Sequence, residues 1–277
     1  MRRIRLVVTD LDGTLLDPRG CLTPRARAAI QALADAGVTL ALATGRRWTG
    51  AAQAAAQFDF RGPLIAFDGA MIRSHPDGKI LHAAPLDRIA AQRVADAMVR
   101  YGIQPIVQFS SPEEEFLHVA AEAANPEWTA AYLPAFRDQV RFCPAAELCS
   151  VASDPLRLAA FAPTTVLRRV AVDLASPNYG RQLLLIGNYA ISELTFFSPL
   201  ASKGSALATL ARMLGIGLEE TMAIGDGVND VSMLRAVGLG VAMGHAPRRV
   251  RAAAHVVTAS NAEDGVAKAL ETYVLGR

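Results

Sequence analysis

The sequence predicts an α/β protein with a doubly wound, Rossmann-like core of parallel strands and an inserted α+β cap domain. Near the N-terminus, short apolar runs alternate with helical segments, which is the pattern of a parallel sheet covered on both faces. The same alternation returns near the C-terminus, and the stretch between has a different texture. We therefore divide the chain into a discontinuous core, residues 1–83 and 199–277, and an inserted α+β cap domain, residues 84–198.

The first part of the core begins with an apolar strand, Ile4–Val8, that runs into a polar loop. Thr23 followed by Pro24 predicts the N-terminus of a helix. Two further strands, Val38–Ala43 and Leu64–Phe67, also end in turns that contain glycine. Because the carboxyl ends of parallel strands meet at one edge of a sheet, we expect these loops to build the functional site.

The second part of the core repeats this order. We expect a helix over Lys203–Leu214 and a strand over Thr221–Ile224 that ends in a Gly-Asp-Gly loop. Two short strands, Leu239–Val241 and His255–Thr258, should follow, with a helix between them.

The inserted stretch should combine helices and strands. Ile89–Tyr101 reads as an amphipathic helix, and Val119–Val151 as an irregular segment with scattered proline. We expect strands over Gln104–Phe109, Val166–Asp173 and Leu183–Ile186.

The composition indicates an ordinary globular protein with no nucleic-acid partner. The 277 residues are 52% hydrophobic, and 28 Lys+Arg against 26 Asp+Glu give a formal charge of only +2. The arginine-rich stretch Arg248–Arg251 should be the solvated face of a helix. Its alternative reading, nucleic-acid binding, would show a steep salt dependence.

No apolar segment is long enough to cross a membrane, and the N-terminal run is too short for a signal peptide. The 3 cysteines lack CxxC spacing, which argues against a disulfide framework or a zinc site. We therefore expect a cytoplasmic protein, as a monomer or a small homo-oligomer.

Four carboxylates should gather at the carboxyl edge of the core sheet. Asp10 and Asp12 follow the first strand, and Asp226 and Asp230 lie in the loop after a later strand. Without a cation they would repel one another. Carboxylate oxygens that leave room for water and a phosphate oxygen suit Mg²⁺ better than zinc, so the sequence predicts a Mg²⁺ site.

Groups that can hold phosphate surround these carboxylates. Thr44 offers its hydroxyl, Gly45 its backbone N–H, Asn229 its amide, and Lys203 a positive charge at a helix N-terminus. This arrangement allows in-line displacement, in which Asp10 attacks phosphorus and becomes an aspartyl-phosphate. Asp12 is placed to protonate the leaving group and then to activate water.

These residues fall into four motifs that resemble those of the haloacid dehalogenase superfamily, in the same order. The motifs are Asp10-Leu11-Asp12-Gly13-Thr14, Thr44-Gly45-Arg46, Lys203-Gly204 and Gly225-Asp226-Gly227-x-Asn229-Asp230. Ala41–Arg46, Ser202–Gly204 and the closing His255–Val266 more narrowly resemble the Cof-type branch, subfamily IIB, of sugar phosphatases. In that branch a large α/β cap is inserted between the second and third motifs.

The resemblance implies that Asp10 is the nucleophile and a metal ligand, and that Asp12 is the acid/base with its backbone carbonyl on the metal. It implies a metal carboxylate at Asp226 and a metal-associated one at Asp230. The phosphate-binding residues that follow from it are Leu11, Thr44, Gly45, Lys203 and Asn229, with Arg46 as a substrate contact. The chain departs from the pattern after the third strand, where it has Asp68-Gly69 in place of the Asn-Gly that relatives often carry. Asp68 would either form the same turn or add negative charge near the substrate.

The predicted function is Mg²⁺-dependent hydrolysis of a small phosphorylated metabolite, with sugar phosphates implied by the resemblance. One alternative is a phosphotransferase or mutase, which would share the chemistry of Asp10 and differ in the acceptor. Another is a protein that binds a phosphorylated ligand without turning it over. The pairing of Asp10 with Asp12 favours catalysis, because binding alone needs no acid/base partner.

Overall fold

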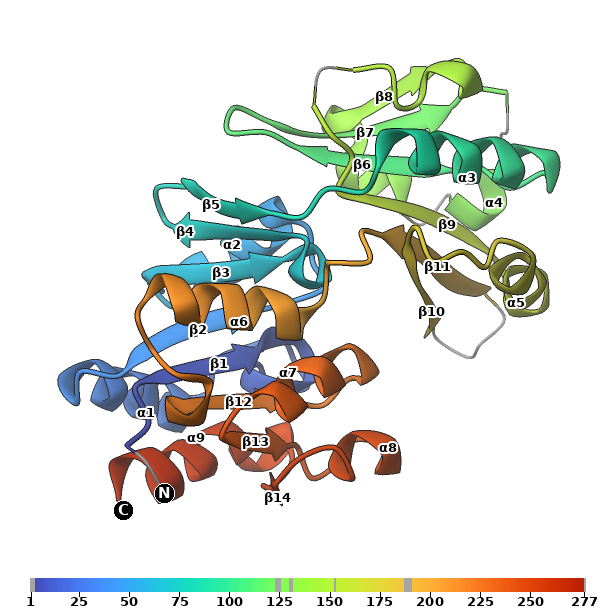
Figure 1. The fold of residues 1–277 in the computed structure, drawn as a ribbon. Helices are drawn as coiled ribbons and strands as arrows, with labels where there is room; N and C mark the ends of the chain where they lie inside the picture. The colour runs from blue at the N-terminus through green and yellow to red at the C-terminus, as the bar shows by residue number, and fades with distance from the viewer. Residues whose placement is uncertain (1–2, 123–125, 130–131, 152, 187–190, 277) are drawn as a thin grey trace. The chain divides into compact units, whose positions relative to one another are not determined.

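The computed structural model describes residues 3–122, 126–129, 132–151, 153–186 and 191–276. The chain forms two compact units, which we call the core unit and the inserted unit (Figure 1). The core unit comprises Met1–His82 and Ser202–Arg277, and the inserted unit comprises Ala83–Ala201.

Among the described residues, eight strands form the sheet of the core unit in the order β14-β13-β12-β1-β2-β3-β4-β5. The strands are β1 (Leu6–Asp10), β2 (Thr39–Ala43), β3 (Gly62–Ala66), β4 (Met71–His75), β5 (Ile80–Ala83), β12 (Thr221–Gly225), β13 (Leu239–Ala242) and β14 (Val256–Val257). The pairs from β14 through β3 are parallel, and β3 pairs antiparallel with β4. The predicted parallel α/β core is therefore confirmed.

Helices cover both faces of this sheet. They are α1 (Pro24–Asp35), α2 (Trp48–Ala56), α6 (Lys203–Met213), α7 (Val231–Ala236), α8 (Arg248–Arg251) and α9 (Gly265–Leu270). Figure 1 shows α6 and α7 together on one face, and α1 packs against α9 on the other. Helix α1 begins where the sequence predicts, because Thr23 accepts a hydrogen bond from the backbone N–H of Ala26 at 3.1 Å and Pro24 fills the first turn.

The inserted unit has its own sheet, whose described strands lie in the order β10-β11-β9-β6-β7-β8. The strands are β6 (Ile106–Ser110), β7 (Glu115–Ala120), β8 (Val140–Cys143), β9 (Arg157–Pro163), β10 (Gly180–Ile186) and β11 (Ile191–Phe197), and the helices are α3 (Arg88–Arg100), α4 (Pro126–Thr129) and α5 (Thr164–Asp173). Its main core joins buried residues of α3 and α5, such as Met98 and Leu167, to Phe109 and Phe196 of the sheet. This mixture of helices and a mainly antiparallel sheet is the predicted α+β architecture.

Short helical turns complete both units. They lie at Leu11–Leu15, Phe67–Gly69, Leu133–Gln139, Ala145–Glu147, Leu218–Glu220, Val228–Asp230, Asn261–Glu263 and Glu271–Leu275. Within the part of the chain that the structure describes, every helix is too short or too polar to span a lipid bilayer.

Two sequence predictions were wrong in the inserted unit. The segment Val166–Asp173 is not a strand but most of α5, because Leu167 and Val170 are buried three residues apart while the two arginines between them are exposed. The β-branched valines suggested a strand, but the burial follows the helical period. Val119–Val151, expected to be irregular, contains the end of β7, all of β8 and, in its described part, α4.

One shift in the core unit matters for the site. The first strand is Leu6–Asp10 rather than Ile4–Val8, since the pairing with β2 continues to Asp10 opposite Ala43. Asp10 is therefore the last residue of a buried strand and is held by the sheet itself.

The turn at Gly69 gives a test of close backbone packing in the core unit. Gly69 has φ +104°, and a Cβ there would lie 2.1 Å from the carbonyl oxygen of Ser202. Gly20 also has a positive φ, +76°, but no atom lies within 4 Å of its Cβ position. We expect Gly20→Ala to lower the free energy of unfolding by about 1 kcal/mol through backbone strain, and Gly69→Ala by about 3 kcal/mol or more.

Urea unfolding of the two variants measures this difference. Equal losses for Gly20→Ala and Gly69→Ala would show that the turn tolerates the methyl group and that the close approach to Ser202 is unimportant.

Candidate active site

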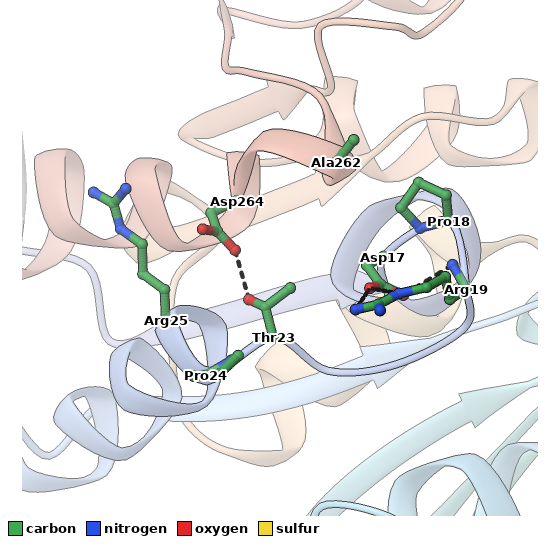
Figure 2. Close-up of a pocket in the computed structure, with 8 residues that line it drawn as sticks. All are labelled: Asp17, Pro18, Arg19, Thr23, Pro24, Arg25, Ala262 and Asp264. Carbon is green, nitrogen blue, oxygen red and sulfur yellow. Dashed lines mark hydrogen bonds and ion pairs between the residues drawn. The ribbon is translucent and has the colours of Figure 1, made fainter.

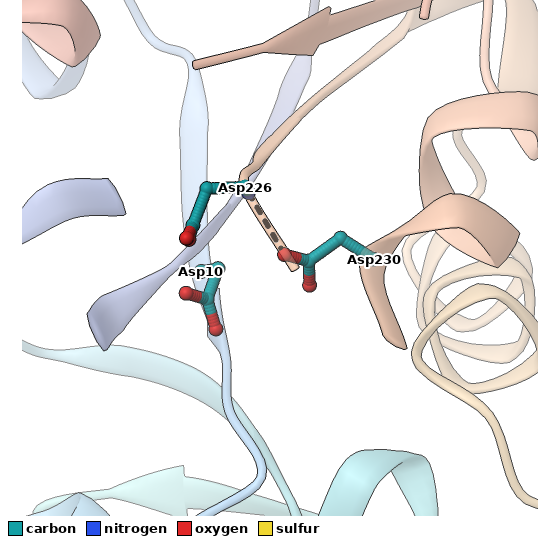
Figure 3. A group of neighbouring side chains, drawn as sticks. All are labelled: Asp10, Asp226 and Asp230. Atoms are coloured by element: carbon teal, nitrogen blue, oxygen red, sulfur yellow. Dashed lines mark hydrogen bonds between the residues drawn. The ribbon is translucent and has the colours of Figure 1, made fainter. Parts of the chain in front are cut away.

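Three of the four predicted metal carboxylates meet at the carboxyl edge of the core sheet. Asp10 ends β1, Asp226 directly follows β12, and Asp230 ends the turn Val228–Asp230. One carboxylate oxygen from each lies within 4.8 Å of the others (Figure 3). Asp10 and Asp230 are buried, at 5% and 0% exposure.

The ammonium group of Lys203 lies between two of these carboxylates. Its Nζ donates to Oδ1 of Asp10 and to Oδ1 of Asp230, both at 2.6 Å. The side chain of Lys203 is 1% exposed. Ser202 caps α6 by accepting from the backbone N–H of Ser205, and so starts the helix at Lys203.

Burial and charge act in opposite directions on these groups. Burial alone would lower the pKa of Lys203, but the carboxylates of Asp10 and Asp230 outweigh it and raise that pKa above its ordinary value. Burial raises the pKa of Asp10 well above its usual value, Lys203 opposes the rise, and Asp230 adds to it. Burial also raises the pKa of Asp226. The cluster therefore has more negative charge than Lys203 alone can balance.

Hydrogen bonds orient the carboxylates of Asp226 and Asp230. Thr14 Oγ1 donates to Oδ1 of Asp226 at 2.7 Å. Oδ2 of Asp230 accepts from the backbone N–H groups of Asp226 at 3.0 Å and Gly227 at 2.8 Å. His245 Nε2 lies 3.6 Å from Oδ2 of Asp226, an ion pair when the imidazole is protonated.

The carboxylate of Asp12 binds the guanidinium group of Arg46. Arg46 Nε donates to its Oδ2 at 2.7 Å, and Arg46 Nη2 to its Oδ1 at 2.5 Å. The Asp12 side chain is 53% exposed. The structure thus joins the predicted acid/base to the predicted substrate contact.

The predicted phosphate-binding residues occupy neighbouring loops. Thr44 is buried directly after β2, and its Oγ1 accepts from the backbone N–H of Arg46 at 3.1 Å. Asn229 Nδ2 donates to Oδ1 of Asp68 at 2.8 Å, and that oxygen lies 2.9 Å from the position of a Cβ at Gly45. The side chain of Leu11 is fully buried in the core, so only its backbone can face a ligand.

Sequence reasoning missed three neighbours of this cluster. Thr14 lies within the first motif, so its place there is the signal that could have identified it. His245 forms no ligand spacing in the sequence, and its loop after β13 reaches Asp226 only through the fold. Asp68 was noted as a departure, but its contact with Asn229 was not foreseen.

The donor set fits a hard cation. Asp10, Asp226 and Asp230 offer only oxygen atoms, and Lys203 compensates one of their charges. Oxygen-only sites with few protein ligands suit Mg²⁺, which keeps several water molecules in its shell.

A separate hollow of about 580 Å³ lies beside the start of α1 (Figure 2). Its charged side chains already have partners, since Arg19 binds Asp17, Thr23 donates to Asp264 and Arg25 binds Glu271. The residues that line this pocket include none of the predicted site residues, and its arginines already bind carboxylates. The carboxylate cluster is therefore the better candidate for an active site.

The fold and the cluster define an α/β protein with a carboxylate group that could hold a metal ion. The family model of the haloacid dehalogenase-like hydrolases matches residues 7–132 and 179–270. The chain belongs to this family, and the resemblance carried by its four motifs is confirmed.

Curated relatives are similar over nearly the whole chain. A 5-amino-6-(5-phospho-D-ribitylamino)uracil phosphatase of Bacillus subtilis is 27% identical, over 98% of this chain and 96% of its own. An HMP-PP phosphatase of Serratia proteamaculans is 31% identical, over 87% of this chain and 84% of its own. Both are named phosphatases, in agreement with the predicted enzyme class.

Solved structures agree with the fold. A haloacid dehalogenase-like hydrolase of Bacillus subtilis superposes with a TM-score of 0.76 at 26% identity, over 97% of this chain and 99% of that one.

The buried ion cluster predicts an unusually large cost for the loss of Lys203. Lys203→Met would leave Asp10 and Asp230 buried without their cation, and we expect it to lower the free energy of unfolding by about 3–5 kcal/mol in EDTA. Lys79 is exposed on the hairpin between β4 and β5, so Lys79→Met is a control that should change stability by less than about 0.5 kcal/mol.

Denaturant unfolding at neutral pH compares the two substitutions. A loss for Lys203→Met no larger than that for Lys79→Met would contradict the view that the two carboxylates depend on this lysine.

Proposed function

We propose that the chain is a Mg²⁺-dependent phosphatase that hydrolyses a small phosphorylated metabolite through an aspartyl-phosphate on Asp10. The observation that carries this proposal is the cluster of Asp10, Asp226 and Asp230, in which buried Lys203 binds Asp10 and Asp230. A carboxylate at the end of a rigid strand, next to a cation and an oxygen-only metal site, is suited to attack phosphorus.

The metal site has a defined task in this reaction. Asp10, Asp226 and Asp230 would hold Mg²⁺ together with the backbone carbonyl of Asp12. When bound, Mg²⁺ would offset the repulsion between the carboxylate of Asp10 and a phosphate dianion.

Other groups of the core unit would position the nucleophile and bind the phosphate. Lys203 holds Oδ1 of Asp10 at 2.6 Å and so fixes the direction of the nucleophile. Thr44, Gly45, Lys203 and Asn229 would hold the phosphate oxygens and stabilise their developing charge. The backbone of Leu11 would add an N–H donor.

Asp12 would protonate the leaving oxygen and then take a proton from the water that hydrolyses the aspartyl-phosphate. Its carboxylate is fixed by two hydrogen bonds from Arg46. To reach the leaving oxygen it has to exchange one of them, so a substrate that engages Arg46 would release Asp12 for catalysis.

The substrate class follows from the relatives and the motifs. The curated relatives act, by their names, on phosphorylated small molecules, and the motifs resemble those of sugar phosphatases. We propose that the inserted unit, which holds none of the predicted catalytic residues, selects the substrate. We also propose a cytoplasmic enzyme that works as a monomer or a small homo-oligomer.

Phosphate release from sugar phosphates, nucleotides, pyridoxal phosphate and flavin mononucleotide tests the proposal. We expect release that requires Mg²⁺, stops in EDTA and falls at least about a thousandfold in Asp10→Asn, because the amide is a poor nucleophile. Asp77→Asn, an exposed position on the hairpin between β4 and β5, should leave the rate unchanged.

Full activity of Asp10→Asn would rule out the proposed nucleophile. Transfer of the phosphoryl group to an added alcohol without free phosphate would instead favour the phosphotransferase or mutase, and binding without turnover would favour a ligand-binding protein.

The raised pKa values of Asp10 and Asp226 predict how Mg²⁺ binding depends on pH. A group with a raised pKa keeps its proton to higher pH, and Mg²⁺ has to displace that proton. We expect the affinity for Mg²⁺ to increase from about pH 4, the ordinary carboxyl range, up through the raised values and then to level off.

Isothermal titration calorimetry with Mg²⁺ across this pH range measures the effect. An affinity that is already constant from about pH 5 upward would mean that the two carboxyl groups titrate normally.

A further inference from the structure

The loops of the proposed phosphate site contain a carboxylate that the mechanism does not use. Asp68 lies in the turn Phe67–Gly69 after β3, with φ +54°. Its backbone N–H donates to the carbonyl oxygen of Thr44 at 3.1 Å, and that of Phe67 to the carbonyl oxygen of Arg46 at 2.9 Å. The turn is therefore tied to the loop that would hold phosphate.

The side chain of Asp68 reaches the groups expected to bind phosphate. Its Oδ1 accepts from Asn229 Nδ2 at 2.8 Å, and its two oxygens lie 2.9 and 3.2 Å from the position of a Cβ at Gly45. Its charge also acts on Lys203: burial would lower the pKa of that lysine, and Asp68 adds to the rise caused by Asp10 and Asp230. Three of the proposed phosphate-binding residues thus already lie in the field of a carboxylate.

This contact has two opposite effects on a phosphate ligand. Asp68 orients the amide of Asn229 by accepting a hydrogen bond from its Nδ2. The Oδ1 atom of the same amide lies against Gly227, 2.4 Å from where a Cβ would stand on that residue. An amide has two N–H groups, so one donor remains for a phosphate oxygen. At the same time, the carboxylate places a negative charge beside a ligand that is itself an anion.

We propose that Asp68 sets the affinity of this site for phosphate, by orienting Asn229 while its negative charge keeps the binding of the dianion weak. The inference rests on the proposed function, since it requires that Gly45, Lys203 and Asn229 bind phosphate. Weak binding of inorganic phosphate favours release of the product after each turnover.

Two substitutions separate orientation from charge. Asp68→Asn removes the charge and replaces one oxygen with an NH2 group, but keeps an oxygen that can accept from Asn229 Nδ2. Asp68→Ala removes both the charge and the acceptor. Asp59→Asn is the matched control, because Asp59 is also an aspartate with a positive φ, +56°, but is exposed after α2.

The measurements are the inhibition constant of inorganic phosphate against p-nitrophenyl phosphate and the rise in melting temperature caused by phosphate, both with Mg²⁺ and the full chain. We expect phosphate to bind about tenfold more tightly to Asp68→Asn, because one unit of repulsion with a dianion is removed. Asp68→Ala should bind phosphate less tightly than Asp68→Asn but more tightly than the native protein, because the effect of the charge outweighs that of orienting Asn229. Asp59→Asn should match the native protein.

The remaining outcomes separate this inference from the proposed function. Unchanged or weaker binding of phosphate by folded Asp68→Asn, with clear inhibition of the native protein, would overturn the role of Asp68 and leave the phosphatase intact. Should Asp68→Asn fail to fold, phosphate binding by Asp68→Ala no tighter than that of the native protein would count against the role of its charge. If the native protein does not hydrolyse p-nitrophenyl phosphate, and phosphate shifts the melting temperature of neither the native protein nor the variants, the site does not bind phosphate, and the inference falls together with the proposed function.

Discussion

The buried ion cluster of Lys203 with Asp10 and Asp230 is the interaction on which the rest of the core unit depends. Lys203 begins α6, Asp10 ends β1, and Asp230 follows β12, so the cluster joins the two chain segments that flank the inserted unit. A buried ammonium requires carboxylate partners, because removing any member leaves an uncompensated charge in a medium of low polarity. The same contacts that position the proposed nucleophile therefore also join the two segments of the core unit.

The negative charge of this cluster is not fully balanced by Lys203. Asp10, Asp226 and Asp230 lie together with one ammonium, and burial raises the pKa of both Asp10 and Asp226. A site built only for stability would not gather these carboxylates, since each additional one raises the cost of the others. Such a departure from the most stable arrangement is expected where a cation is to be bound, because the cation supplies the missing compensation.

The sequence was sufficient for those parts of the fold and site that depend on local pattern. The alternation of strands and helices, the Thr23 cap and the position of each motif at a strand end or a helix start could be predicted directly. The parallel sheet then brought Asp10, Asp226 and Asp230 together. Local pattern failed at α5, where valines favoured a strand but burial follows a helical period. It could not show the contacts of Asp68 or His245, because their partners are distant in the sequence and only the folded loops bring them near.

Under the proposed function, the charges around the cluster would also link metal binding to phosphate binding. Asp68 lies at the donors expected to hold phosphate, while Asp10 belongs to the carboxylate cluster and is the proposed nucleophile. A phosphate dianion that entered without a metal ion would therefore meet these carboxylates, with the ammonium group of Lys203 as a compensating cation. A bound metal ion would remove part of this repulsion, so each ligand would increase the affinity for the other by the same factor. The two ligands could then bind in either order, and the complex that contains both would be favoured over either alone.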